Sequence, residues 1–279
     1  MTGKLCAFLI LLLVGALTPR QASSALGELT ITPWRVAFQD RDRSSSIELL
    51  NESDSPHTYR MGWTLLKALP NGRYDQVFYN KDKDKDPHSV ANMVIVSPRQ
   101  VMIEPHGEQI IRLSLRRPSD LPPGEYRAHL MFIKLADPTP PQDPKAKTVS
   151  MSLNVNVGFS IPVIVRQGED KDLKVSIQSP KLRAAGNGSM LDLEIHRDAG
   201  KFSTYGSIYA YWKSPKGDES KVGELHNVAL YPEVQTRKIS MPLLRNANIV
   251  GGTLRVVYEG AQESEDTTWA EKTFPVGGK

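Results

Sequence analysis

The sequence has a single cysteine, and it lies near the N-terminus. Cys6 stands at the front of an apolar run rather than at its end, which makes it a poor site for lipidation. Beyond residue 25 the chain has no cysteine, so disulfide bonds are excluded there. Small extracellular modules are commonly rich in disulfides. An exported chain without disulfides fits a bacterial periplasm better.

Long apolar runs are also missing after the start of the chain. The run at residues 8–17 is too short to span a bilayer. It follows Lys4 and precedes the small residues Ser23, Ser24 and Ala25, which is the order found in a secretory signal peptide. We therefore expect residues 1–25 to be removed and the product to be periplasmic and not membrane-embedded.

No stretch repeats apolar residues with the period of a long helix. Instead, 20 glycines and 20 prolines separate short runs in which apolar and polar residues alternate. This pattern predicts an all-β chain, and its length suggests two sandwich domains, at 26–167 and 168–279, with residues 167–170 as the linker. The tail after Trp269 is expected to be frayed. Strands are expected at 27–39 (broken at Pro33), 45–51, 57–69, 93–97, 100–104, 109–115, 125–135, 148–166, 173–178, 191–196, 207–212, 222–230, 234–241 and 252–258.

Signatures of catalysis and metal binding are missing as well. There is no nucleophile elbow, zinc-protease motif or phosphate-binding loop, and the six histidines are scattered without ligand spacing. Lysines interrupt the aspartates at 81–86, and Glu263 and Glu265 fall in a polar stretch that needs no acid–base role. The net charge of +4 is spread along the chain without a basic, aromatic patch. We predict no enzyme activity, no metal, no cofactor and no nucleic-acid partner.

The most informative stretch is the alternating run at 148–166. Its apolar residues fall on every odd position from Val149 to Val165, as in a strand with one apolar face. At about 3.3 Å per residue it would span roughly 55 Å, which is longer than a domain of this size is wide. Pro162 cannot donate to a ladder and favours an edge position. Two interpretations stay open: the face fills its own core, or part of it is kept for another chain.

Several segments together resemble the periplasmic chaperones of chaperone–usher pili. They are ITPWRVAF, IELLNESDSPHTYRMGW, the run from SPRQVMIEPHGEQ to MFIKL, and the long strand ending GFSIPVIVR. The resemblance covers most of 27–167 and extends to the second domain only in its sandwich-like pattern. It implies two immunoglobulin-like β-sandwich domains in an L-shaped arrangement. It also implies pilin subunits and an outer-membrane usher as partners.

In this family the chaperone lays an edge strand into the open groove of a pilin, and an arginine in the cleft pairs with the pilin's C-terminal carboxylate. The resemblance makes Arg35 that anchor, and we expect its side chain to lie outside the core. It also pairs Glu125 with Arg166 as an interdomain salt bridge and gives Arg112 a structural role. The donor residues would be Val149, Met151, Leu153, Val155, Val157 and Phe159.

The chain departs from the family at one point, because the cleft lysine of better-known members is replaced near Ile161 or Pro162 by a residue without charge. This departure favours the archaic or alternate branch. Two other functions remain possible. One is an exported structural or adhesive sandwich protein that self-assembles by strand exchange. The other is an enzyme on a β-sandwich, which would need converging carboxylates or histidines.

Overall fold

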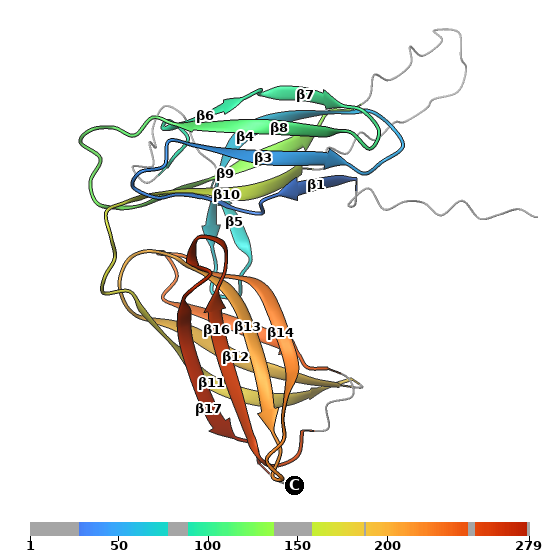
Figure 1. The fold of residues 1–279 in the computed structure, drawn as a ribbon, viewed down its shortest axis with the longest axis vertical. Helices are drawn as coiled ribbons and strands as arrows, with labels where there is room; N and C mark the ends of the chain where they lie inside the picture. The colour runs from blue at the N-terminus through green and yellow to red at the C-terminus, as the bar shows by residue number, and fades with distance from the viewer. Residues whose placement is uncertain (1–27, 78–88, 137–157, 187, 245–248, 278–279) are drawn as a thin grey trace, which may run out of the picture.

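The computed structural model describes residues 28–77, 89–136, 158–186, 188–244 and 249–277. Within these ranges the chain consists of strands and one short 3₁₀ helix, η1 (Gln262–Ser264). The strands form two sandwiches, one above the other in Figure 1. The prediction of an all-β fold with two sandwiches is therefore confirmed.

The first sandwich has the strand arrangement of an immunoglobulin fold. One sheet has the order β1-β3-β8-β6 and the other β2-β10-β9-β4-β5, with β7 paired to β4. In the letters used for that fold, β1, β3, β8 and β6 correspond to the ABED sheet. β4, β9 and β10 correspond to the CFG sheet, to which β2, β5 and β7 are added. Its strands are β1 (Leu29–Thr32), β2 (Val36–Phe38), β3 (Ser44–Asn51), β4 (His57–Ala68), β5 (Tyr74–Val77), β6 (Val94–Ser97), β7 (Gln100–Ile103), β8 (Glu108–Leu115), β9 (Gly124–Lys134) and β10 (Gly158–Gln167).

Two local features explain how this sandwich is organised. Pro33 interrupts the first strand as expected, so β1 pairs with β3 in one sheet and β2 pairs with β10 in the other. At the start of β9 the hydroxyl of Tyr126 donates a hydrogen bond to the carbonyl oxygen of Pro122 at 2.8 Å. A tyrosine that bonds back to the chain just upstream is a hallmark of immunoglobulin-like corners.

The second sandwich repeats this plan with sheets β11-β12-β15 and β14-β13-β16-β17. The expected fraying after Trp269 is wrong, because β17 pairs with β16 from Thr268 to Pro275. Most of its side chains are exposed, so the strand lacks the apolar alternation by which most of the others were recognised. The strands are β11 (Lys174–Ala185), β12 (Gly188–Ala199), β13 (Thr204–Lys213), β14 (Glu219–Leu230), β15 (Thr236–Pro242), β16 (Thr253–Gly260) and β17 (Thr268–Pro275).

The two sandwiches share an apolar contact. Ala37 on β2, Ala68 on β4 and Ile164 on β10 point away from the first core and pack with the core of the second sandwich. In Figure 1 the strands of the first sandwich run across the view and those of the second run along it, so the two meet at a steep angle. β10 ends at Gln167, the first residue of the expected linker, and the domain boundary itself stays a prediction.

Candidate functional site

Glu125 and Arg166 form a buried ion pair at the junction of the sandwiches. They lie directly opposite each other on the paired strands β9 and β10. The Nε atom of Arg166 is 3.1 Å from Oε2 of Glu125, and their side chains are only 9% and 1% exposed. Both residues belong to the first sandwich, so the pair by itself joins two strands rather than two domains.

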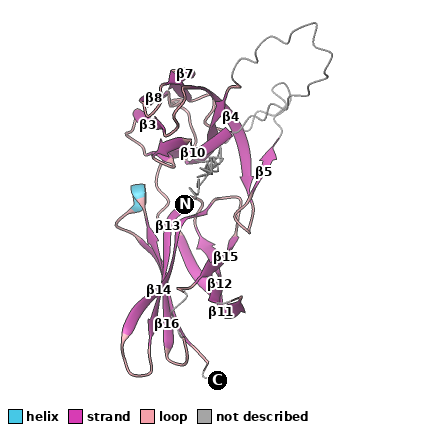
Figure 2. Cartoon of the chain, turned by 90° about the vertical axis from the view of Figure 1, so that its right-hand side faces the viewer, coloured by secondary structure: helices cyan, strands magenta, loops and turns pink. Residues whose placement is uncertain are grey.

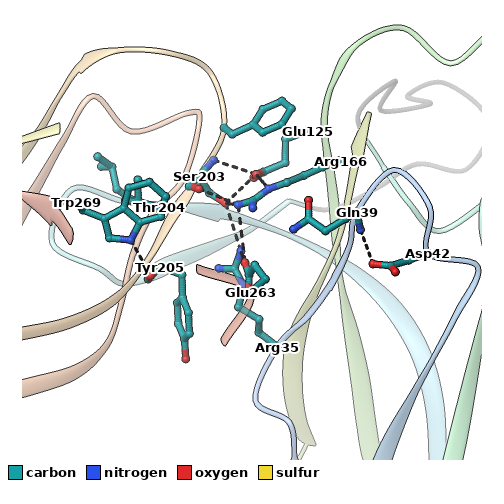
Figure 3. Close-up of polar contacts among 12 residues, drawn as sticks. Arg35, Gln39, Asp42, Glu125, Arg166, Ser203, Thr204, Tyr205, Glu263 and Trp269 are labelled. Atoms are coloured by element: carbon teal, nitrogen blue, oxygen red, sulfur yellow. Dashed lines mark hydrogen bonds and ion pairs between the residues drawn. The ribbon is translucent and has the colours of Figure 1, made fainter. Parts of the chain in front are cut away.

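Ser203, in the second sandwich, connects this pair across the interface. Its backbone N–H and its hydroxyl donate to Oε2 of Glu125 at 2.9 and 2.8 Å. Its carbonyl oxygen accepts a hydrogen bond from Nη2 of Arg166 at 2.8 Å. Figure 3 shows the three residues gathered between the two sandwiches. The buried charge of Glu125 is stabilised because its Oε2 atom accepts hydrogen bonds from Arg166 and from both donors of Ser203, whereas its buried Oε1 atom has no hydrogen-bond partner among the described residues.

Arg35 also lies in this interface, in the bend between β1 and β2. Its side chain is 1% exposed, and its Nη2 atom is 2.6 Å from Oε1 of Glu263 in the second sandwich. Its guanidinium lies 4.6 Å from the centre of the Tyr205 ring. The expectation that Arg35 lies outside the core is therefore wrong: it contacts the second sandwich, whose position the sequence does not give. Glu263, expected in a solvated polar loop, is its partner.

The other predicted arginine, Arg112, is far less constrained. It lies on β8 with an exposed side chain, in the sheet that does not contain β9 and β10. No hydrogen bond or ion pair is recorded for its guanidinium among the described residues. It thus offers a natural control for experiments on Arg35.

Sequence reasoning missed a second contact between the sandwiches, made by the β4–β5 hairpin and by Arg127. The guanidinium of Arg127 forms an ion pair with Glu233 and lies 3.7 Å from the centre of the Tyr231 ring. Glu233 also accepts a hydrogen bond from the backbone N–H of Ala68 at 2.9 Å. In the sequence, the only signal is that Arg127 shares the face of β9 with Glu125, two residues away.

His129 follows on the same face of β9 and is 2% exposed. The Tyr74 ring packs against it in an edge-on contact, with ring centres 5.3 Å apart. Burial, helped by the positive charge of Arg127, lowers the pKa of His129 from 6.5 to about 3. The imidazole is therefore neutral at physiological pH.

This burial predicts a pH dependence of stability. The unfolded chain takes up a proton on His129 near pH 6.5 and the folded chain does not, so the contribution of the neutral ring is complete above that pH. We expect the free energy of unfolding to fall by about 1.4 kcal/mol per pH unit as the pH drops below about 6. Urea unfolding between pH 5 and 7 checks this: His129→Gln should flatten the slope, whereas His106→Gln, at an exposed histidine, should not. An unchanged slope in His129→Gln would contradict the prediction.

The edge of β10 is only half covered. All of β10 pairs with β9 on one side. On its other side β2 pairs only with Val163–Val165. Within the described residues, Gly158–Pro162 therefore has no strand on this second side. Such an edge presents unpaired backbone N–H and C=O groups to another chain.

The expected donor residues fall mostly outside this part of the structure. Val149, Met151, Leu153, Val155 and Val157 lie outside the described residues. Phe159 is described and is half-buried against the core of its own sandwich, and the next odd positions of β10 are fully buried members of that core. In the described part of the strand, the odd face therefore serves the first sandwich.

The described ranges give no sign of a metal centre or a membrane span. No three His, Cys, Asp or Glu side chains within them gather as they would around a metal ion. Nor do they include a helix long and apolar enough to cross a membrane.

No protein-family model matches the sequence, and no curated protein matches it. Among solved structures, the fold is similar to that of the YadV chaperone, with 12% identity and a TM-score of 0.43 over 89% of this chain and 100% of that one. It is also similar to the E. coli chaperone DraB, with 15% identity and a TM-score of 0.43 over 90% and 96% of the two chains. The CsuC–CsuE chaperone–tip adhesion subunit complex of Acinetobacter baumannii gives 13% identity and a TM-score of 0.41 over 90% and 99%. At such identities the likeness concerns the fold alone.

Proposed function

We propose that the chain is a periplasmic chaperone of a chaperone–usher system. It binds pilus subunits by lending them an edge strand and delivers them to an outer-membrane usher. The observation that carries the proposal is the open edge at Gly158–Pro162, which continues directly into the alternating run at 149–157. An edge of this kind accepts an extended partner through backbone hydrogen bonds, while alternate side chains supply specificity.

The donor residues account for the affinity. Val149, Met151, Leu153, Val155 and Val157 would fill the apolar groove of a subunit, with Phe159 at the point where the strand enters its own sandwich. Full burial of four such side chains contributes roughly 6–12 kcal/mol before costs. The loss of freedom on association removes much of this, so the complex is tight but reversible.

Arg35 lies at the point where a partner strand, added along the open edge of β10, would end. It precedes Val36, which pairs with Val163, so the open part of the edge stops beside it. Trp34, next to it, is 60% exposed and offers an apolar surface at the same point. A chain that terminates here brings its α-carboxylate towards a guanidinium, which suits a charge-assisted pair.

The function is tested by purifying the tagged chain from the periplasm of its native host. We expect a small β-rich subunit to co-purify in equal amounts. Recovery of the chain alone, or only as an oligomer of itself, would contradict the proposal and favour a self-assembling structural protein.

The anchoring role of Arg35 predicts a loss of subunit that exceeds the loss of fold. Arg35→Ala removes the nearer partner of the Glu263 carboxylate and leaves it only Arg166 at 3.8 Å, which costs up to about 3 kcal/mol of stability for a buried pair. We expect subunit recovery, measured per amount of folded chaperone, to drop at least about tenfold as well. Arg112→Ala, on the opposite sheet, should change neither quantity. Normal recovery with folded Arg35→Ala would place the anchor at another residue.

A further inference from the structure

We propose that, in the free chain, the carboxylate of Glu263 pairs with Arg35 in the place that the carboxylate of a ligand would otherwise take. A peptide C-terminus would then gain Arg35 only by displacing Glu263. The inference rests on the proposed function. It deepens that function by naming the residue that pairs with Arg35 before a subunit binds. It follows from where Glu263 comes from, how Arg35 is paired and how deeply both are buried.

Glu263 reaches Arg35 from the other sandwich. It lies in η1, within the connection from β16 to β17, at the end of the second sandwich that faces the first (Figure 2). This connection is held by its own backbone hydrogen bonds, such as the bond from Ser264 N–H to the carbonyl oxygen of Ala261 at 3.2 Å. The η1 turn therefore reaches Arg35 through one side chain, that of Glu263, at the tip of a separately folded turn.

The pairing of Arg35 is incomplete. Within the described part of the chain, only its Nη2 atom has polar partners, Glu263 at 2.6 Å and the hydroxyl of Ser203 at 3.4 Å. Its Nε and Nη1 atoms are buried and have no hydrogen-bond partner among the described residues. A guanidinium has five N–H donors, and donors that are buried without partners cost free energy. A carboxylate that also reached these donors would therefore satisfy Arg35 more completely than Glu263 does.

Arg166, the neighbouring arginine, is different. It has Glu125 at 3.1 Å, the carbonyl oxygen of Ser203 at 2.8 Å, and Glu263 only at 3.8 Å. Removal of Glu263 would leave Arg166 paired and Arg35 without a carboxylate. The role of Glu263 is therefore centred on Arg35 rather than on the Glu125–Arg166 pair.

Burial makes the exchange obligatory. The side chains of Arg35 and Glu263 are 1% and 11% exposed, so solvent and ligands do not reach the guanidinium while the pair is intact. A ligand carboxylate offers Arg35 the same kind of charge-assisted bond that it gives up. A neutral chain end offers no such replacement and leaves a buried charge unpaired. The contact therefore favours partners that end in a free carboxylate close to the edge of β10.

The test measures the binding of two peptides to three forms of the full mature chain. The probe is an acetylated heptapeptide of alternating valine and threonine, made with a free C-terminal acid and with a C-terminal amide. Glu263→Gln removes the internal carboxylate and keeps the side-chain shape, and Glu265→Gln is the matched control on an exposed neighbour. By calorimetric titration we expect Glu263→Gln to bind the acid at least about tenfold more tightly than the unaltered chain, with no gain for the amide. Glu265→Gln should behave like the unaltered chain.

Absence of acid-selective binding in Glu263→Gln overturns the inference, and so does an equal gain in the control. Where Glu263→Gln does not fold, Glu263→Asp keeps the charge but shortens the side chain, and an intermediate gain for the acid is then expected; no gain overturns the inference. The proposed function is judged separately by co-purification of a subunit. A co-purifying subunit without acid selectivity defeats the inference alone, whereas acid selectivity without any subunit defeats the function alone.

Discussion

Arg166→Ala is expected to destabilise the chain by about 3–5 kcal/mol. The substitution leaves the carboxylate of Glu125, 1% exposed, without its charged partner. The breaking of a buried pair costs this much because the remaining charge cannot be solvated. It also removes the hydrogen bond from Arg166 to the carbonyl oxygen of Ser203, so the two sandwiches should become less strongly coupled. Urea unfolding followed by tryptophan fluorescence measures both effects, the second as a separation into two transitions.

An exposed ion pair supplies the control for this experiment. Arg183 and Asp192 are 2.9 Å apart, with side chains 48% and 35% exposed. Arg183→Ala should therefore cost less than about 1 kcal/mol. The double variant Glu125→Ala, Arg166→Ala should be less destabilised than the sum of its single variants, because neither charge is then left alone. A loss below 1 kcal/mol in Arg166→Ala would show that the pair does not join the sandwiches energetically.

The fold was largely predictable because alternation is a local property of the sequence. The strands that alternate clearly, such as β4, β8 and β9, were expected close to where they lie. The break at Pro33 was also expected, because proline removes a ladder donor. β5 (Tyr74–Val77) and β17 (Thr268–Pro275) were missed, since both are edge strands whose side chains are largely exposed. An edge strand that is held mainly by its backbone bonds leaves little trace in apolar patterning.

The site was predictable only in part. The Glu125 and Arg166 positions came from the family resemblance, and the structure brings their side chains together. No sequence pattern predicted the roles of Ser203, Glu233 and Glu263. Each of them contacts a residue of the other sandwich that is far away along the chain. Contacts of that kind depend on how two folded domains meet, which no local periodicity records. The burial of Arg35 was misjudged for the same reason.

The largest functional effect is expected from substitutions at the proposed donor residues. Replacing Leu153 and Val155 together with aspartate would place two charges in the apolar groove of a subunit, at a cost of several kcal/mol. We expect subunit co-purification to be lost. In an alternating strand Asn154 and Asn156 would point to the opposite side, so we expect the matched variant with aspartate at both positions to retain most of the co-purifying subunit. A sticky surface without register would not distinguish the two variants.

The same pair of variants also separates donation from ordinary core packing. In the described part of the strand, the odd positions Ile161, Val163 and Val165 are buried in the core of the first sandwich, where both of its sheets already contribute side chains. Leu153 and Val155 precede this part, so we expect the Leu153→Asp, Val155→Asp variant to retain its circular dichroism spectrum and melting temperature when it is alone. Loss of the cooperative melt in the absence of any subunit would mean that these residues complete their own core. A soluble, folded variant that no longer retains a subunit would instead show that the odd face at 153–155 serves another chain, because only a partner's groove would then register the two charges.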